Sequence, residues 1–200
     1  MDKPKKRIFL FLGHPDKSGN NGDFIDAYEH GAKEAGFEVK RMNLGDMQFD
    51  PILHHGYRAI QHLEPDLKTF QENIKWCDHF VIFYPIWWAS MPALLKGLFE
   101  RVWLPGFAYR FHRGDQNWKK LLWDKLLTGK TAHVVVTMDN WPTIAQLFFG
   151  DITSQMTSGV LGFAGIGPTA VSKIGGMKFM TPERKSSRMN MIAQWGREGK

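Results

Sequence analysis

Short runs of apolar residues alternate along the chain with segments in which apolar residues recur every three or four positions. The runs at 7–13, 79–85 and 131–138 are each as long as a strand and apolar on both faces. Such continuous runs are typical of central strands in a parallel sheet that helices cover on both sides. Residues 37–44 alternate more and predict a strand nearer an edge, and residues 171–176 predict the last strand.

Other segments have the spacing of amphipathic helices. Within 24–35, apolar or small residues recur three and four positions apart, and Gly36 is placed to end that helix. A second apolar stripe occupies 91–102, with Ser90 placed to cap the helix and Pro92 tolerated in its first turn. Further helices are predicted at about 66–77, 118–127, 143–158 and 183–196.

This alternation of strands and helices predicts an α/β fold with a three-layer, doubly wound parallel sheet. No internal repeat and no linker divides the chain, so residues 1–200 are expected to form a single domain. In such sheets, ligands bind at the carboxyl ends of the strands. The candidate binding loops are therefore 13–22, 85–90 and 138–143.

The first of these loops, 13–22, contains three glycines and opens a helix. Its amides and the helix dipole would form an anion site, with Ser18, Asn20 and Asn21 as further donors, and a phosphate is the natural ligand. Neither the Walker spacing nor the dinucleotide fingerprint is present. The alternative is an ordinary glycine turn, with His14 as a local hydrogen-bonding residue.

The other two loops would add flat walls and backbone donors at the same edge. Trp87 and Trp88 beside a phosphate site suit an aromatic cofactor that carries a phosphate, unless both rings pack beneath a helix. Residues 137–140 would offer backbone donors to the polar edge of a heterocycle, and Trp141 would shape one wall. An ordinary helix start is the alternative for this third loop.

Composition narrows the possible partners. The formal charge of +6 is compatible with nucleic acid, an anionic membrane face or a phosphorylated small molecule, but part of it lies at the termini, and we expect no nucleic-acid partner. Cys77 is the only cysteine and the histidines have no paired ligand spacing, so no metal site is expected. No apolar run approaches the roughly 20 residues of a membrane span, which favours a cytoplasmic protein.

Two segments, Gly13–Val39 and Tyr84–Tyr109, resemble the flavodoxin-like NAD(P)H:quinone oxidoreductases, the family of DT-diaphorase. The second segment contains Pro-Ala, Leu-Lys-Gly, Glu-Arg-Val and Gly-Phe-Ala-Tyr in the order found in that family. The resemblance extends over roughly residues 1–140. It implies a flavodoxin-like fold with a five-stranded sheet and a homodimeric flavoenzyme that holds FAD or FMN and uses NAD(P)H as co-substrate.

The resemblance also implies roles for individual residues. The phosphate part of the flavin would be held by His14, Ser18, Gly19, Asn20 and Asn21. The isoalloxazine would lie along Pro85, Ile86, Trp87, Trp88 and Ala89, and beside Thr137, Met138, Asp139 and Asn140. The substrate would contact Trp141 and, from the partner subunit, Tyr109 and Phe111. Arg101 and Trp103 would support the dimer.

The third loop departs from the family pattern. Family members commonly have Thr-x-Gly-Gly there, followed by a tyrosine and a histidine assigned to proton handling. Here the loop reads Thr-Met-Asp-Asn, and after Tyr109 the only tyrosine or histidine residues are His112 and His133. We expect the backbone amides of 138–140 to stabilise negative charge at the pyrimidine edge of the reduced flavin, a role that needs no particular side chain.

The predicted function is the transfer of a hydride from NAD(P)H through the flavin to a quinone or a similar acceptor, such as an azo or nitro compound, in a two-step exchange. The flavin performs the hydride chemistry, so no catalytic side chain is assigned. Two alternatives are a one-electron flavodoxin carrier, although such carriers are usually small and acidic, and a regulatory quinone-reductase-like ancillary subunit of a transport system.

Overall fold

The computed structural model describes residues 5–112 and 122–200. Its main feature is a sheet of five parallel strands in the order β2-β1-β3-β6-β7. The strands of this sheet are β1 (Arg7–Leu12), β2 (Glu38–Asn43), β3 (His79–Pro85), β6 (Thr131–Thr137) and β7 (Thr169–Ile174). The order moves outward from β1 in both directions, as a doubly wound sheet requires.

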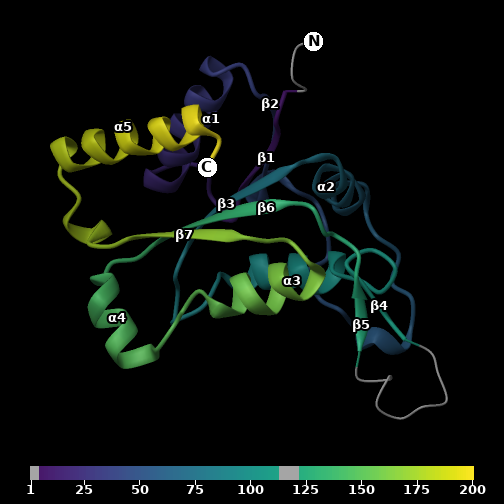
Figure 1. The fold of residues 1–200 in the computed structure, drawn as a ribbon. Helices are drawn as coiled ribbons and strands as arrows, with labels where there is room; N and C mark the ends of the chain where they lie inside the picture. Colours follow the sequence, from purple (N-terminus) through teal and green to yellow (C-terminus); the bar gives the residue numbers. More distant parts are fainter. Residues whose placement is uncertain (1–4, 113–121) are drawn as a thin grey trace.

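Helices cover both faces of the sheet (Figure 1). They are α1 (Asn20–Glu34), α2 (Pro65–Trp76), α3 (Ala93–Val102), α4 (Pro142–Phe149) and α5 (Pro182–Glu198). Helices α1 and α5 pack on one face, while α2, α3 and the π-helical segment η4 (Gln155–Gly162) pack on the other. Short 3-10 turns are η1 (Leu44–Asp46), η2 (Gly56–Arg58) and η5 (Met177–Phe179).

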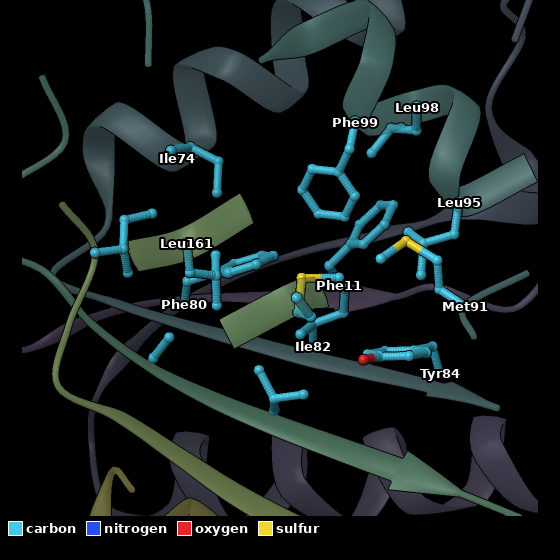
Figure 2. Packing of buried hydrophobic residues seen from close by; sticks show 14 of the residues in the cluster. Phe11, Ile74, Phe80, Ile82, Tyr84, Met91, Leu95, Leu98, Phe99 and Leu161 are labelled. Atoms are coloured by element: carbon cyan, nitrogen blue, oxygen red, sulfur yellow. The ribbon is translucent and has the colours of Figure 1, made fainter. Parts of the chain in front are cut away.

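Alternate residues of the central strands point to opposite faces and build two separate cores. Figure 2 shows the core under α2 and α3, where Phe11, Phe80 and Ile82 of the sheet meet Ile74 of α2 and Phe99 of α3. All five side chains are buried. The other core lies beneath α1 and α5. Both faces of β3 are therefore covered along its whole length.

Glycines bring α1 and α5 into close contact. A Cβ atom on Gly31 would lie 2.0 Å from the carbonyl oxygen of Ala193, and one on Gly196 would lie 2.2 Å from that of Tyr28. The two backbones therefore meet at positions where no larger side chain fits. This contact fixes α5 against α1, the helix that follows the first candidate loop.

The five predicted strands are confirmed, with ends that differ by a few residues, and the strand at 37–44 corresponds to the edge strand β2. The predicted helices at 24–35, 66–77 and 183–196 correspond to α1, α2 and α5. The prediction of one domain over 1–200 stays a prediction. The flavodoxin-like α/β class follows from the strand order and the layers.

Three local predictions were wrong. The helix predicted at 118–127 partly lies outside the described residues, and its described part contains the strand β5 (Trp123–Lys125), which pairs with β4 (Tyr109–Phe111). The helix predicted at 143–158 is divided after Phe149, where Gly150 has a φ of 70° that ends α4. Ser90 does not cap α3, because the helix begins at Ala93 after Pro92 and the Ser90 hydroxyl donates to Gln155 at 2.7 Å instead.

Candidate functional site

A cavity of about 800 Å³ opens at the carboxyl edge of the sheet. This volume is within the range of pockets that hold drug-sized ligands and cofactors. Its lining includes thirteen of the fourteen residues predicted to bind the cofactor. These are His14, Ser18, Asn20, Asn21, Pro85, Ile86, Trp87, Trp88, Ala89, Thr137, Met138, Asp139 and Asn140. The three candidate loops therefore meet around one hollow.

The first loop leaves the amino terminus of α1 open to an anion. Gly19 is the residue before the helix, and no side chain caps the helix there. The amides of Asn20, Asn21 and Gly22 belong to the first turn, which has no intrahelical acceptors, and no hydrogen bond is found for them within the described residues. Three unpaired N–H groups and the positive end of the helix dipole form a suitable donor set for a phosphate.

Gly22 allows this loop to close tightly onto the helix. A Cβ atom at Gly22 would lie 1.9 Å from the carbonyl oxygen of Lys17, closer than real atoms approach. The loop is thus shaped by a backbone contact that only glycine permits. We call this loop, together with the first-turn amides of Asn20, Asn21 and Gly22, the phosphate cradle, because these donors suit a phosphate.

Two side chains of this loop have defined hydrogen bonds. The Nδ1 atom of His14 accepts from the Asp16 amide at 2.9 Å, so in the neutral ring Nε2 carries the proton and is left to donate. The Ser18 hydroxyl donates to the Asp16 carboxylate at 2.7 Å, and this bond is the main reason that the pKa of Asp16 is lowered. Ser18 must release Asp16 before it can donate to a bound phosphate.

The second loop is a tight two-residue turn with unusual occupants. Trp87 and Ser90 exchange backbone hydrogen bonds of 2.9 and 3.0 Å, and the residues between them, Trp88 and Ala89, have φ values of 51° and 60°. Positive φ at both central positions is typical of a type I′ hairpin turn, where Asn-Gly is preferred. The turn leaves the Trp88 side chain fully exposed at the cavity and brings Trp87 edge-on to His14, with ring centroids 5.4 Å apart.

The third loop offers two amides rather than the three that we expected. The Met138 amide donates to the Ile174 carbonyl at 3.0 Å in continuation of the sheet, so the expectation was wrong for Met138. Within the described residues, the amides of Asp139 and Asn140 have no hydrogen-bond partner. These two N–H groups are available to acceptor atoms of a ligand.

Five further residues line the cavity and were missed in the sequence. They are Ala145, Phe149, Ile152, Met177 and Lys178. Ala145 and Phe149 are four residues apart on α4 and therefore lie on the same face of the helix. The helix predicted after the third loop could thus have indicated that both residues face the cavity. Met177 and Lys178 follow the last strand, whose carboxyl end reaches the same edge as the others. The same reasoning, applied to the loop that follows the last strand, would have predicted that Met177 and Lys178 line the cavity.

Four predicted site residues lie outside this cavity lining. Gly19, with a φ of 88°, shapes the start of α1 but is not part of the wall. Trp141 precedes α4 and packs against the backbone of Gly176. Tyr109 and Phe111 belong to β4, which lies on the opposite side of the molecule from α4 (Figure 1). Neither can contact a ligand in the cavity of its own chain.

Arg101 and Trp103 are buried and bonded within their own chain, and the expectation that they support a dimer stays a prediction. The Arg101 side chain is 1% exposed, forms an ion pair with Glu64 at 2.8 Å and donates to the His62 carbonyl at 2.9 Å. The indole of Trp103 is buried and donates to the Val160 carbonyl at 2.9 Å. Both residues hold segments of the same chain together.

Neither a metal centre nor a membrane-spanning helix is found in the described parts of the chain. Residues 5–112 and 122–200 contain no group of three or more histidine, cysteine or acidic side chains that could hold a metal ion. No helix in those ranges is both long enough and apolar enough to cross a bilayer.

The curated relatives of this chain are named as oxidoreductases. A ribosyldihydronicotinamide dehydrogenase-like protein of Penicillium crustosum is 35% identical over 155 residues, which cover 68% of this chain and 58% of that protein. NAD(P)H dehydrogenase (quinone) 1 of Cavia porcellus is 29% identical over 127 residues, which cover 53% of this chain and 46% of that protein. The chain therefore spans about half the length of these curated relatives.

A solved structure has the same fold over almost the whole chain. The NAD(P)H:quinone oxidoreductase from Methanothermobacter marburgensis superposes with a TM-score of 0.78 at 21% identity, covering 98% of this chain and all of that one. The family model described as flavodoxin-like fold matches residues 6–198. With the strand order β2-β1-β3-β6-β7, this match shows that the chain belongs to the Flavodoxin_2 family.

Proposed function

We propose that the protein is a flavin-dependent oxidoreductase that takes a hydride from NAD(P)H and passes it to a quinone or a similar acceptor. The observation that carries this proposal is the cavity at the sheet edge, where amides of a helix terminus without partners among the described residues lie beside aromatic walls. The names of the curated relatives support the same class of reaction.

The cavity suits the two ends of a flavin differently. The amides of Asn20, Asn21 and Gly22 would bind the phosphate, and the proton on His14 Nε2 would add one hydrogen bond. At the other end, the amides of Asp139 and Asn140 would donate to the polar edge of the ring. The flavin, when bound, supplies the hydride chemistry, and these residues hold and orient it.

The walls would exclude water from the reacting face. Trp88 and Ile86 come from the second loop, while Phe149 and Ile152 come from α4 and the segment after it. Among the described lining residues His14 is the only histidine and there is no tyrosine, so the cavity offers no tyrosine–histidine relay. The hydride chemistry would be supplied by a bound flavin, so no side chain of the cavity is required as an acid or base for that chemistry.

We also propose that a second copy of the chain completes the substrate cavity. The resemblance assigns Tyr109 and Phe111 to the partner's site, and both lie far from the cavity of their own chain. Phe111 is half exposed, and Tyr109 packs edge-on to it with ring centroids 5.0 Å apart. Phe111→Ala is expected to reduce acceptor turnover in a dimer, and sedimentation that shows only monomers would contradict this part of the proposal.

The main test is reconstitution followed by turnover. The purified protein is incubated with FMN or FAD, the retained chromophore is identified by chromatography, and oxidation of NADH and NADPH is measured with menadione as acceptor. Gly22→Ala should lose flavin because the added Cβ displaces the loop at Lys17. Gly159→Ala is a matched control, since a Cβ there would have no neighbour within 4 Å.

The outcomes separate the candidate functions. Flavin retention with turnover by the wild type and Gly159→Ala, and loss of both by Gly22→Ala, supports the proposal. Flavin retention without two-electron turnover would favour a carrier or a regulatory subunit. A protein that retains neither flavin would contradict the proposal altogether.

A further inference from the structure

Lys178 is the only lysine or arginine among the described residues that line the cavity. Its side chain is exposed, and it forms no ion pair and no side-chain hydrogen bond within residues 5–112 and 122–200. The only acidic residue among the described lining residues is Asp139.

Backbone hydrogen bonds fix the segment that carries Lys178 next to the third loop. The Met177 amide donates to the Met138 carbonyl at 3.1 Å, and the Gly176 amide donates to the Asn140 carbonyl at 3.3 Å. Lys178 therefore follows a turn that is attached to the loop with the two unpaired amides. The backbone at Lys178 and these amides therefore lie on the same side of the cavity.

The strand order of the sheet gives the distance between the Lys178 side of the cavity and the phosphate cradle. The cradle comes after β1 and Lys178 after β7, which is three strand spacings away in the order β1-β3-β6-β7. At about 4.8 Å per spacing, the two regions are roughly 14 Å apart. A flavin with its phosphate in the cradle would thus extend its ring, and not its phosphate, towards Lys178.

We propose that Lys178 supplies the positive charge beside the pyrimidine edge of the bound flavin, where the third loop lacks the tyrosine and histidine of the resembling family. The inference rests on the proposed function and assigns a cofactor-contacting residue to it. The pyrimidine edge gains negative charge when the ring is reduced, so a nearby cation stabilises the reduced form more than the oxidised form. Lys178 would then tune the reduction potential rather than anchor the cofactor.

The test compares flavin affinity with flavin potential in four variants. Lys178→Met removes the charge and keeps much of the length, whereas Lys178→Arg keeps the charge. Lys68→Met is the matched control, because Lys68 is an exposed lysine on α2, outside the cavity lining. Asp139→Asn removes the opposing carboxylate and leaves the backbone amide in place. For each, the dissociation constant of the oxidised flavin and the midpoint potential are measured at low ionic strength.

In Lys178→Met, we expect the affinity for oxidised flavin to stay within about twofold of wild type, since the amide donors are intact. The affinity for reduced flavin should fall about tenfold, which lowers the midpoint potential by about 30 mV for a two-electron couple. Lys178→Arg and Lys68→Met should keep the wild-type potential. Asp139→Asn should raise it.

Two results would overturn the inference while the proposed function stands. Equal weakening of oxidised and reduced flavin in Lys178→Met would show that Lys178 binds another part of the cofactor, such as a phosphate. An unchanged potential in Lys178→Met would show that its charge does not reach the ring. A wild-type protein that binds no flavin would overturn both proposals.

Discussion

The side chains of Asn21 and Thr137 form a buried pair of hydrogen bonds that joins the first and third loops of the cavity. Asn21 Nδ2 donates to Thr137 Oγ1 at 3.0 Å, and the Thr137 hydroxyl donates to Asn21 Oδ1 at 3.1 Å. Both side chains are less than 10% exposed. The link fixes the start of α1, which carries the phosphate cradle, relative to the end of β6, where the third loop begins.

Replacing Thr137 with Val should therefore affect both stability and cofactor binding. The change keeps the shape of the side chain but leaves the buried Asn21 amide without its partner, which costs roughly 1–3 kcal/mol of unfolding free energy. The first turn of α1 would also lose its connection to the third loop, and we expect flavin to bind about tenfold more weakly, or about 1.4 kcal/mol. Urea unfolding and a fluorescence titration with flavin measure the two effects.

Thr131→Val is the control for this prediction. Thr131 begins the same strand, and its hydroxyl hydrogen-bonds the Nδ1 atom of His79 at 2.6 Å at the opposite edge of the sheet from the cavity. Its replacement should also destabilise the fold but leave flavin affinity unchanged. Equal losses of affinity in both variants would mean that the Asn21–Thr137 link has no specific role at the site.

The positive φ values of Trp88 and Ala89 should lower the stability of the protein, and glycine at either position should relieve this backbone strain. Residues other than glycine with positive φ cost on the order of 1 kcal/mol each, so Ala89→Gly is expected to raise the free energy of unfolding by about that amount. Trp88→Gly should relieve the same strain but lose the ring, and with it roughly 0.5–1.5 kcal/mol of aromatic contact with the flavin. Stability and flavin affinity would then change in opposite directions in Trp88→Gly.

Thermal unfolding of the apo protein and flavin titration of the same samples check this prediction. Trp88→Phe is the comparison, because it keeps both an aromatic ring and the strained backbone. If Trp88→Gly bound flavin as tightly as Trp88→Phe, the ring would not be part of the binding surface.

The close contact between α1 and α5 predicts that replacing Gly31 with alanine lowers the stability of the protein. Glycine in a helix interior normally costs about 1 kcal/mol relative to alanine. At Gly31 the added methyl group would overlap the Ala193 carbonyl oxygen at 2.0 Å, so Gly31→Ala should instead destabilise the protein by roughly 1–3 kcal/mol. Chemical denaturation measures the change. Gly159→Ala has no such neighbour, and destabilisation of that variant to the same degree would contradict the packing argument.

The five-stranded sheet could be predicted from the sequence because its central strands are buried on both faces and their residues are continuously apolar. The edges where β1, β3 and β6 end could be located for the same reason, and thirteen predicted residues line one cavity. Local contacts were harder to predict. The helix at 143–158 kept its apolar spacing across Gly150, so periodicity alone missed the break.

Tertiary contacts explain the other differences. Arg101 has the spacing of a surface position on α3, and only the approach of the 50–64 segment buries it against Glu64. Met138 ends the apolar run 131–138 and also opens the third loop, and the pairing with β7 continues far enough for the Ile174 carbonyl to accept the Met138 amide. Lys178 lies near the cavity because its turn is bonded to the third loop. None of these contacts is encoded in the spacing of apolar residues.

Two buried histidines should make the stability of the fold depend on pH. Burial lowers the pKa of His79 from 6.5 to about 4, and it also lowers the pKa of His133. The unfolded chain then binds protons below about pH 6.5 that the folded chain does not bind. The stability present above pH 6.5 is therefore lost as the pH falls towards 4, by up to roughly 3 kcal/mol from His79 alone.

Urea unfolding between pH 7 and pH 4.5 measures this loss with little contribution from carboxylates, whose ordinary pKa values lie at or below the bottom of that range. His79→Gln cannot titrate but can still hydrogen-bond Thr131, so its stability should change less with pH than that of the wild type. His30→Gln is the matched control, because His30 is exposed on α1. If wild type and His79→Gln lost stability in parallel over this range, the buried ring of His79 would not be the group that titrates.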